Sequence, residues 1–201
     1  MMKMSGEAVI RPRAAKAYFD REGARWDRHA RHELHNLRTI MRVLDLRVGQ
    51  RVLDVACGTG VLFPWLLSRD PQLLMGIDIS EAMTENARAM HRDRRLRIVT
   101  ADYFNMEAGN FDRIIVFNAY PCFPDREKFA QRTLKLLIPG GRFVVAHNAG
   151  RKGVNAMPEA WGGCSAPLQS ADEECSWFEP YFEMDVSIDN EELYLISGVK
   201  R

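Results

Sequence analysis

Short apolar runs alternate with longer segments of helical spacing through the middle of the chain. The runs that we expect to form strands are residues 52–55, 73–77, 96–100, 113–117 and 141–146. Helix-like segments separate them, and this alternation is typical of a parallel sheet whose strands are joined by right-handed crossovers. We therefore expect an α/β fold.

Capping residues indicate where two of the helices begin. Ser80 precedes Glu81 and a helical run, and Asp125 precedes a second run with apolar residues at core-facing spacing. The sequence Pro139-Gly140-Gly141 predicts a sharp end to the second helix and a turn into the next strand.

The two ends of the chain have different patterns. Between residues 13 and 46, apolar residues recur at mixed three- and four-residue steps, which predicts one or two amphipathic helices over the sheet or its open end. Residues 147 to about 169 are loop-like, and a helix capped by Ser170 follows. Residues 181–188 and 191–199 alternate apolar and polar positions, which predicts a pair of antiparallel strands.

Length and composition limit the classes of protein to which the chain can belong. With 201 residues, 46% of them apolar, it has the material for one packed domain and is not disordered as a whole. Its longest uncharged stretch, residues 55–68, is shorter than the about 20 apolar residues of a membrane-spanning helix. The first 19 residues carry five charges and lack the apolar segment of a secretory signal. We expect a cytoplasmic protein without membrane association.

The net charge of +1 conceals an uneven distribution. Residues 1–51 hold 12 Lys/Arg and 6 Asp/Glu, whereas residues 151–201 hold 4 and 10. The balanced total argues against a general affinity for nucleic acid, so a nucleic-acid partner is not expected. The four cysteines have neither CxxC spacing nor a histidine at zinc-site spacing, and we expect reduced thiols and no metal site.

A strand runs straight into a glycine-bearing turn in the segment Arg51-Val-Leu-Asp-Val-Ala-Cys-Gly-Thr-Gly60, and residues 61–68 continue as a helix. Gly58 and Gly60 allow a ligand to approach the backbone, and the start of the helix offers free N–H groups. Phe63 stands where a dinucleotide-binding G-x-G-x-x-G fingerprint needs its third glycine, which disfavours NAD-type pyrophosphate binding. No Gly-Lys-Ser/Thr follows, which excludes a P-loop.

This segment resembles motif I of the class I S-adenosylmethionine-dependent methyltransferases, in which an acidic residue precedes G-x-G-x-G. Asp54 is the acid here, and Ala56, Gly58 and Gly60 occupy the glycine positions. Four later blocks match the family in order and spacing: Gly76-Ile-Asp78-Ile-Ser80, Thr100-Ala-Asp102-Tyr103, the strand from Phe111 to Asn118, and Leu136-Leu137-Ile138-Pro139-Gly140-Gly141. The match spans residues 52–146. It implies a Rossmann-like, seven-stranded, mostly parallel sheet with helices on both faces and an antiparallel C-terminal strand.

The resemblance also implies which residues bind the cofactor, S-adenosyl-L-methionine. The Asp78 carboxylate would bind both ribose hydroxyls, Asp102 would accept from the adenine amino group, and Tyr103 would flank the ring. Ile79 and Met83 would wall the adenine, with plain core packing as the alternative for Met83. Asp54 would orient the turn and reach the methionine amino group through water. The other residues assigned to this site are Ala56, Cys57, Gly58, Gly60 and Asn118.

The methyl acceptor should bind beyond the carboxyl ends of the fourth and fifth strands, where open parallel sheets bind their ligands. His147 is the first candidate for a general base because imidazole titrates near neutrality, and a structural role is the alternative. Asn118 and Tyr120 would orient the substrate or close over the sulfonium. The sequence Asn118-Ala-Tyr-Pro121 departs from the (Asn/Asp)-Pro-Pro-(Tyr/Phe) signature of methyltransferases acting on nucleobase amino groups, which disfavours a flipped base.

Two further segments complete the expected substrate pocket. The residues Tyr18-Phe19-Asp20 and Trp26-Asp27 resemble an F-D-x-x-A-x-x-W-D helix that forms a lid in many small-molecule members of the family, with a plain packing helix as the alternative. The insert after the fifth strand has polar and aromatic residues, which suggests a small, polar or anionic acceptor. The candidate substrate-binding residues are Tyr18, Trp26, Tyr120, His147 and Asn155.

We therefore expect one domain over residues 1–201, with a helical lid or cover (1–50), a cofactor-binding core (51–147) and a substrate-side insert with closing strands (148–201). The expected activity is metal-independent transfer of a methyl group to an O, N or S atom of a small molecule. One alternative is a protein or RNA methyltransferase, for which the basic N-terminal region would be a docking surface. The other is a non-catalytic S-adenosylmethionine-binding partner protein. No oligomeric state is indicated.

Overall fold

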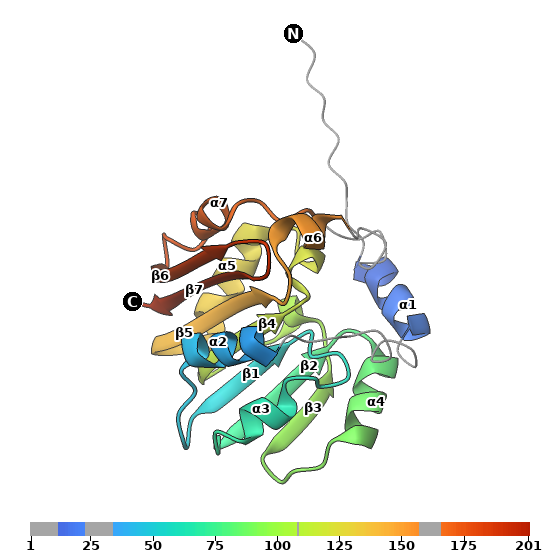
Figure 1. Ribbon diagram of the computed structural model, residues 1–201. Helices are drawn as coiled ribbons and strands as arrows, with labels where there is room; N and C mark the ends of the chain where they lie inside the picture. Colours follow the sequence, from blue (N-terminus) through green and yellow to red (C-terminus); the bar gives the residue numbers. More distant parts are fainter. Residues whose placement is uncertain (1–11, 23–33, 108, 157–165) are drawn as a thin grey trace.

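A seven-stranded sheet forms the centre of the structure, with helices on both of its faces (Figure 1). The computed structural model describes residues 12–22, 34–107, 109–156 and 166–201. The strands are β1 (Arg51–Val55), β2 (Leu73–Asp78), β3 (Leu96–Thr100), β4 (Phe111–Phe117), β5 (Leu137–His147), β6 (Phe182–Asp189) and β7 (Tyr194–Lys200).

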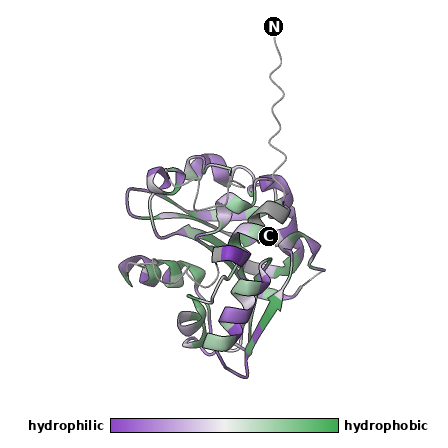
Figure 2. Ribbon diagram, turned by 90° about the vertical axis from the view of Figure 1, so that its right-hand side faces the viewer, coloured by the Kyte–Doolittle hydropathy of each residue, from purple (hydrophilic) through white to green (hydrophobic). Residues whose placement is uncertain are grey.

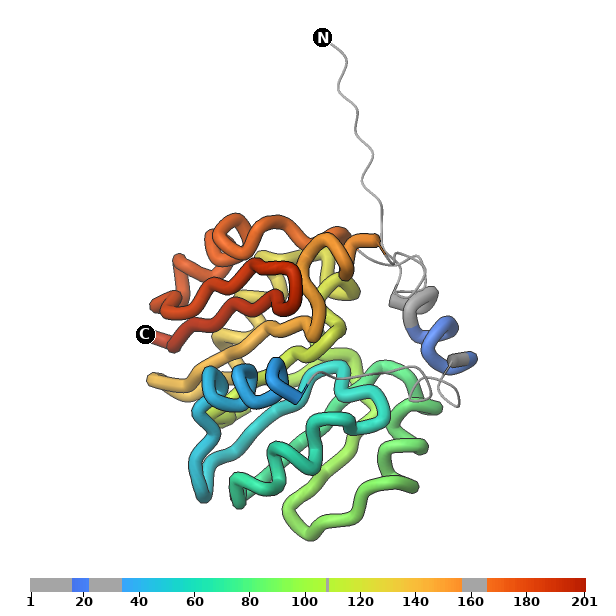
Figure 3. Tube along the Cα trace, viewed as in Figure 1, coloured from blue at the N-terminus to red at the C-terminus, as the bar shows by residue number. Residues whose placement is uncertain are grey.

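The strands are ordered β3-β2-β1-β4-β5-β7-β6 across the sheet. Every neighbouring pair from β3 to β5 is parallel, and β7 is antiparallel to both β5 and β6. Figure 3 follows the chain from β5 through the helices beyond it and back into the β6–β7 pair. The expected mostly parallel sheet with an antiparallel strand near its C-terminal end is confirmed.

The largest difference from the predicted strands lies at the start of β5, which we expected at residue 141. It begins at Leu137 instead, directly after a helix. Phe111 pairs with Leu137 and Arg113 pairs with Arg142, so the residues around the Pro-Gly-Gly sequence bulge out of the ladder. Gly140 adopts a φ of +73°, which accommodates that bulge.

Seven helices and two short 3₁₀ turns surround the sheet within the described residues. The helices are α1 (Pro12–Glu22), α2 (Leu34–Leu44), α3 (Phe63–Leu67), α4 (Glu81–Met90), α5 (Arg126–Leu136), α6 (Arg151–Asn155) and α7 (Ala171–Cys175). The 3₁₀ turns are η2 (Tyr103–Asn105) and η3 (Tyr120–Cys122). The capping predictions are confirmed, because Ser80, Asp125 and Ser170 each accept a backbone N–H at the start of their helix. Helix α6 lies within the stretch that we expected to be a loop.

Alternation along the strands divides the core into two layers. Val52, Ile115 and Val144 face one side and pack with α2, α3 and Ala87 of α4. Their chain neighbours face the other side and pack with α5, α6 and α7. The helices carry both hydrophobic and hydrophilic residues along their length, as Figure 2 shows, because each helix buries one side only.

Two of the sequence predictions concern membrane-spanning helices and the state of the cysteines. None of the helices in this part of the chain is long and apolar enough to cross a membrane. Cys57 and Cys175 are free thiols. Cys164 lies outside the described residues.

Candidate active site

The carboxyl ends of β1, β2, β3 and β4 meet at one edge of the sheet because these strands are parallel. The glycine turn follows β1, Asp78 ends β2, Asp102 follows β3 and Asn118 follows β4. The predicted cofactor residues from these four positions therefore lie along a single edge, at the site where open α/β sheets bind ligands.

Asp78 connects the end of β2 to the glycine turn. Its Oδ2 accepts from the Gly58 N–H at 2.9 Å, and its Oδ1 accepts from the Ser80 N–H at 2.9 Å. Burial raises the pKa of Asp78 even though these hydrogen bonds favour the ionised form. Both carboxylate oxygens are thus held in fixed positions beside the glycine turn.

Gly58 leaves open space beside this carboxylate. Its φ is +53°, and no atom lies within 4 Å of the place that a Cβ would occupy. A ligand can therefore approach the backbone of the turn at the point where Asp78 is bound. A diol-bearing cofactor such as S-adenosylmethionine fits this combination of a positioned carboxylate and an open backbone.

Asp54 is a second buried acid at the same turn. It lies in β1 opposite Gly76 of β2, and 2% of its surface is exposed. Burial raises its pKa well above the ordinary value, and the nearby charge of Asp78 raises it further. Two buried acids with raised pKa values make this edge of the sheet a favourable site for a cationic ligand.

Two residues without the freedom of glycine adopt left-handed backbone at the ends of adjacent strands. Ala56 after β1 has a φ of 54°, and Asn118 after β4 has a φ of 52°. The Asn118 side chain is held by a neighbour, because its Oδ1 accepts from the Asn148 N–H at 2.8 Å. Such conformations cost free energy and concentrate at functional sites. The turn at Ala56 also explains the preference for glycine at this position of the family motif.

The back of the glycine turn is held by aromatic packing. The Phe63 ring lies against Gly60 and Gly76, where a Cβ would collide with it. His91 packs edge-on against Phe63, with ring centroids 5.2 Å apart, and its Nε2 is 3.0 Å from the Thr59 carbonyl oxygen. Cys57 is buried here, and burial raises its pKa.

The residues expected to surround adenine fall into two groups. Asp102 and Ile79 are partly exposed, and the Asp102 Oδ1 accepts from the Phe104 N–H at 2.9 Å. Tyr103 and Met83 are buried instead. The Tyr103 hydroxyl is 2.7 Å from Thr133 Oγ1, and its ring packs on Phe129, so it faces the core beneath the edge.

Helix α1 lies at the same edge, beside the start of α4 (Figure 1). The Ser80 hydroxyl donates to Asp20 Oδ1 at 2.6 Å. Burial alone would raise the pKa of Asp20, but hydrogen bonds from Lys16 and Ser80 leave it lowered. Tyr18 is partly exposed on this helix, and Trp26 lies outside the described residues.

The structure brings Tyr120 and His147 into the core and away from the open edge. Tyr120 has no exposed surface, and its hydroxyl donates to Glu174 Oε2 at 3.2 Å. His147 is 1% exposed at the end of β5, where it pairs with Tyr194 of β7. Burial, reinforced by the charge of Arg126, lowers the pKa of His147 to about 3. At neutral pH this ring is uncharged and is a very weak base.

A buried ion pair organises the elements around Tyr120. Arg126 Nε lies 3.2 Å from Glu174 Oε2, and both side chains are almost fully buried. The Arg126 guanidinium lies over the Tyr120 ring at 4.0 Å from its centroid and donates to the Tyr120 carbonyl at 2.8 Å. The pair thereby joins η3, α5 and α7.

Asn155 has a structural contact on the same side of the molecule. Its side chain donates to the Leu168 carbonyl at 2.9 Å and accepts from the Leu168 N–H at 2.8 Å. Both of its polar atoms are therefore occupied in holding the chain that follows α6.

The sequence did not reveal the interactions between residues that are far apart along the chain. Ser80 was recognised as a helix cap, but its bond to Asp20 joins residues 60 positions apart. The Arg126–Glu174 pair joins residues 48 positions apart and leaves no local pattern. Within the described residues, no group of three or more His, Cys, Asp or Glu side chains is arranged to hold a metal ion.

Comparisons with known proteins agree with this geometry. Residues 53–145 match the model of a methyltransferase domain. Methyltransferase GfsG of Streptomyces halstedii is 30% identical over 51% of this chain and 39% of its own length. Nocamycin O-methyltransferase of Saccharothrix syringae is 35% identical over 52% and 40%. Demethylmenaquinone methyltransferase of Thermus thermophilus is 34% identical over 55% and 54%. The chain thus spans about half or less of the length of these curated relatives.

Solved structures share the fold at lower identity. The N-methyltransferase NodS of Bradyrhizobium japonicum, in complex with S-adenosyl-L-homocysteine, has a TM-score of 0.72 at 18% identity, covering 93% of this chain and 98% of NodS. The methyltransferase of a Haloferax volcanii complex with the Trm112 activator has a TM-score of 0.76 at 19% identity, covering 90% and 97%. The methyltransferase-domain match over residues 53–145, the similar relatives and the shared fold together support a class I S-adenosylmethionine-dependent methyltransferase domain in this chain.

Proposed function

We propose that this protein is a cytoplasmic enzyme that transfers a methyl group from S-adenosylmethionine to an O, N or S atom of a small molecule, without a metal. The observation that carries the proposal is the Asp78 carboxylate, held by the Gly58 and Ser80 N–H groups beside open backbone. The small-molecule acceptor is supported by relatives whose names include nocamycin and demethylmenaquinone.

In this proposal the carboxyl ends of the first three strands bind the cofactor. The Asp78 carboxylate accepts hydrogen bonds from the two ribose hydroxyls, Asp102 accepts one from the adenine amino group, and Ile79 lies along the ring. Asp54 supplies negative charge for the cationic part of the cofactor. When bound, S-adenosylmethionine supplies an electrophilic methyl group on sulfur.

The acceptor would lie beyond β4 and β5, beneath α1. Asn118 is the partly exposed side chain at that position, and its hydrogen bond to the Asn148 N–H would keep it oriented toward the acceptor. The Asp20–Ser80 bond supports a lid or cover at residues 1–50, because it anchors α1 beside Asp78. Residues 51–147 would then form the cofactor core, and residues 148–201 the substrate side, with Asn155 bracing its loop.

We assign structural roles to Tyr120 and His147. Tyr120 is engaged by Glu174 and Arg126, and the pKa of about 3 leaves His147 without useful basicity at neutral pH. The acceptor atom would therefore arrive already deprotonated or would lose its proton to water. This favours acceptors such as thiolates, neutral amines and acidic phenols or enols.

A macromolecular acceptor is the second candidate, and the excess of basic residues in residues 1–51, with 12 Lys/Arg and 6 Asp/Glu, favours it. The two candidates differ in how strongly binding of the acceptor should depend on salt concentration. A protein or RNA acceptor that docks on basic residues would bind with a steep dependence on salt concentration, whereas a small neutral acceptor would not.

The deciding experiment uses cofactor labelled on its methyl group and a cell extract divided by dialysis into small molecules and macromolecules. We expect label to enter the small-molecule fraction with the wild-type chain and not with Asp78→Asn. Label in RNA or protein, suppressed by salt, would replace the small-molecule proposal with the second candidate. S-adenosylhomocysteine binding without label transfer to either fraction would identify a non-catalytic binding protein.

A further inference from the structure

A concentration of arginines lies around the end of α4, whereas Asp78 precedes the start of this helix. Residues 88–97 hold five arginines and one acid, a charge of +4 in ten residues of a chain whose net charge is +1. They span the end of α4 and the start of β3, which is an edge strand of the sheet.

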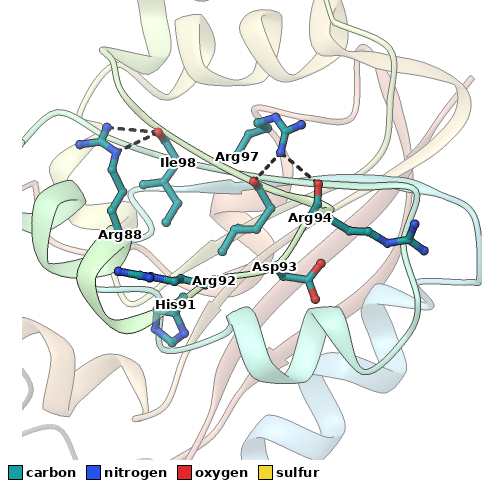
Figure 4. Close-up of a pocket in the computed structure, with 8 residues that line it drawn as sticks. Arg88, His91, Arg92, Asp93, Arg94, Arg97 and Ile98 are labelled. Carbon is teal, nitrogen blue, oxygen red and sulfur yellow. Dashed lines mark hydrogen bonds between the residues drawn. The ribbon is translucent and has the colours of Figure 1, made fainter.

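These residues line a pocket of about 550 Å³ that is open to solvent (Figure 4). A volume of this size lies within the range of small-molecule sites. Its lining includes Arg88, Arg92, Arg94 and Arg97, together with His91, one acid, Asp93, and two apolar residues.

Carboxylates neutralise only part of this charge. Arg95, outside the lining, forms ion pairs with Asp93 at 2.7 Å and Asp70 at 2.5 Å. No ion pair joins the four lining arginines to an acid within the described chain. Their net positive charge is therefore available to a ligand.

Two of the arginines are fixed in position by the backbone. Arg88 donates to the Ile98 carbonyl at 3.1 and 3.3 Å, and Arg97 donates to the Arg94 and Leu96 carbonyls at 3.0 and 2.9 Å. A carbonyl positions a guanidinium without cancelling its charge. Each group keeps further N–H donors, and the planar fork of a guanidinium suits the oxygens of a phosphate.

We infer that this pocket is a binding site for phosphate groups, separate from the cofactor site. The phosphate could belong to a free phosphorylated compound or to a nucleic-acid backbone, and both sources offer the same oxygens to the arginines. Protection of an exposed sheet edge by charge would explain Arg97 on β3. It does not explain Arg92 and Arg94, which precede the strand and line the same pocket.

The test measures binding of inorganic pyrophosphate to the full chain by calorimetry, with a single-stranded RNA oligonucleotide as the second probe. The variant is R92Q/R94Q, because both side chains are exposed and their removal disturbs no side-chain hydrogen bond given by the described structure. The matched control is R38Q/R42Q, which removes two exposed arginines from α2. Melting curves of both variants verify that they fold.

We expect saturable pyrophosphate binding that R92Q/R94Q weakens about tenfold or more and that R38Q/R42Q changes less than about twofold. Saturating S-adenosylhomocysteine should leave pyrophosphate affinity intact. Saturable binding of RNA alone, with the same variant pattern, would identify nucleic acid as the source of the phosphate. The inference fails if neither probe saturates, if both variants weaken binding equally, or if S-adenosylhomocysteine displaces pyrophosphate.

Discussion

Two buried polar clusters in this molecule are built in opposite ways. At the glycine turn, Asp54 and Asp78 are two acids, and no ion pair within the described residues supplies either with a cation. Burial raises both of their pKa values. Between α5 and α7, Glu174 has its cation at 3.2 Å in Arg126. No described ion pair neutralises the first cluster, which fits our proposal of a cationic ligand there, whereas the second is neutralised within the chain and holds three elements together.

The largest effect should come from breaking the second cluster. Glu174→Ala leaves Arg126 buried without its partner and should lower the free energy of unfolding by about 3–5 kcal/mol, as measured by urea denaturation. The matched control is Glu179→Ala, which removes an exposed acid and should change the free energy of unfolding by less than about 0.5 kcal/mol. Replacing the pair together, in R126M/E174L, should cost less than Glu174→Ala. Equal stability of Glu174→Ala and the control would show that the pair is not structural.

The next effect should be on ligand binding. Asp78→Asn exchanges a carboxylate for an amide that cannot accept from two hydroxyls as strongly, and S-adenosylhomocysteine affinity should fall about tenfold or more, or about 1.4 kcal/mol. Calorimetry measures it, and Asp185→Asn on β6 serves as the surface control. Unchanged affinity would remove Asp78 from the cofactor site.

The third prediction concerns how Asp54 affects the free energy of unfolding at different pH values. The folded pKa of Asp54 is raised, so the folded chain holds this proton more tightly than the unfolded chain does. The contribution of Asp54 to unfolding free energy therefore falls as pH rises from its ordinary pKa, 3.8, toward the raised value. Without cofactor, Asp54→Asn should be more stable than wild type at neutral pH, and the difference should shrink toward pH 4. A difference that stays constant with pH would contradict a buried ionisable Asp54.

The smallest effect concerns the backbone of the turn. Ala56→Gly removes the cost of left-handed backbone at a φ of 54° and adds flexibility to the unfolded chain. We expect stability to stay level or to rise by about 0.5 kcal/mol. In contrast, Ala89→Gly in α4 should lose about 0.5–1 kcal/mol. Equal losses in both variants would mean that Ala56 carries no strain.

The turn and the helix starts on the proposed cofactor side were largely predictable because the information for them is local. A strand, a turn and a helix start lie within a few residues of each other around Gly58, and Ser80 and Asp125 mark helix starts by their own side chains. The acids at the ends of β2 and β3 could be placed on one edge because parallel strands bring their carboxyl ends together.

The acceptor side was less predictable because long-range packing determines it. Tyr120 and His147 occupy strand-end positions where a catalytic role is reasonable, but the Arg126–Glu174 pair and β7 bury them. Residue type alone predicted a histidine titrating near neutrality, whereas its surroundings lower the pKa to about 3. Tyr103 was likewise drawn into the aromatic core by Phe129 and Thr133.

The strand order has a consequence for how the chain is made. β7 follows β6 during synthesis, yet it lies between β5 and β6 in the finished sheet. When residues 182–189 leave the ribosome, the edge of β5 is still open, and β6 runs in the direction that would let it pair there wrongly. We therefore expect the β6–β7 hairpin to form as a unit before it pairs with β5, because only then does β7 take the edge of β5.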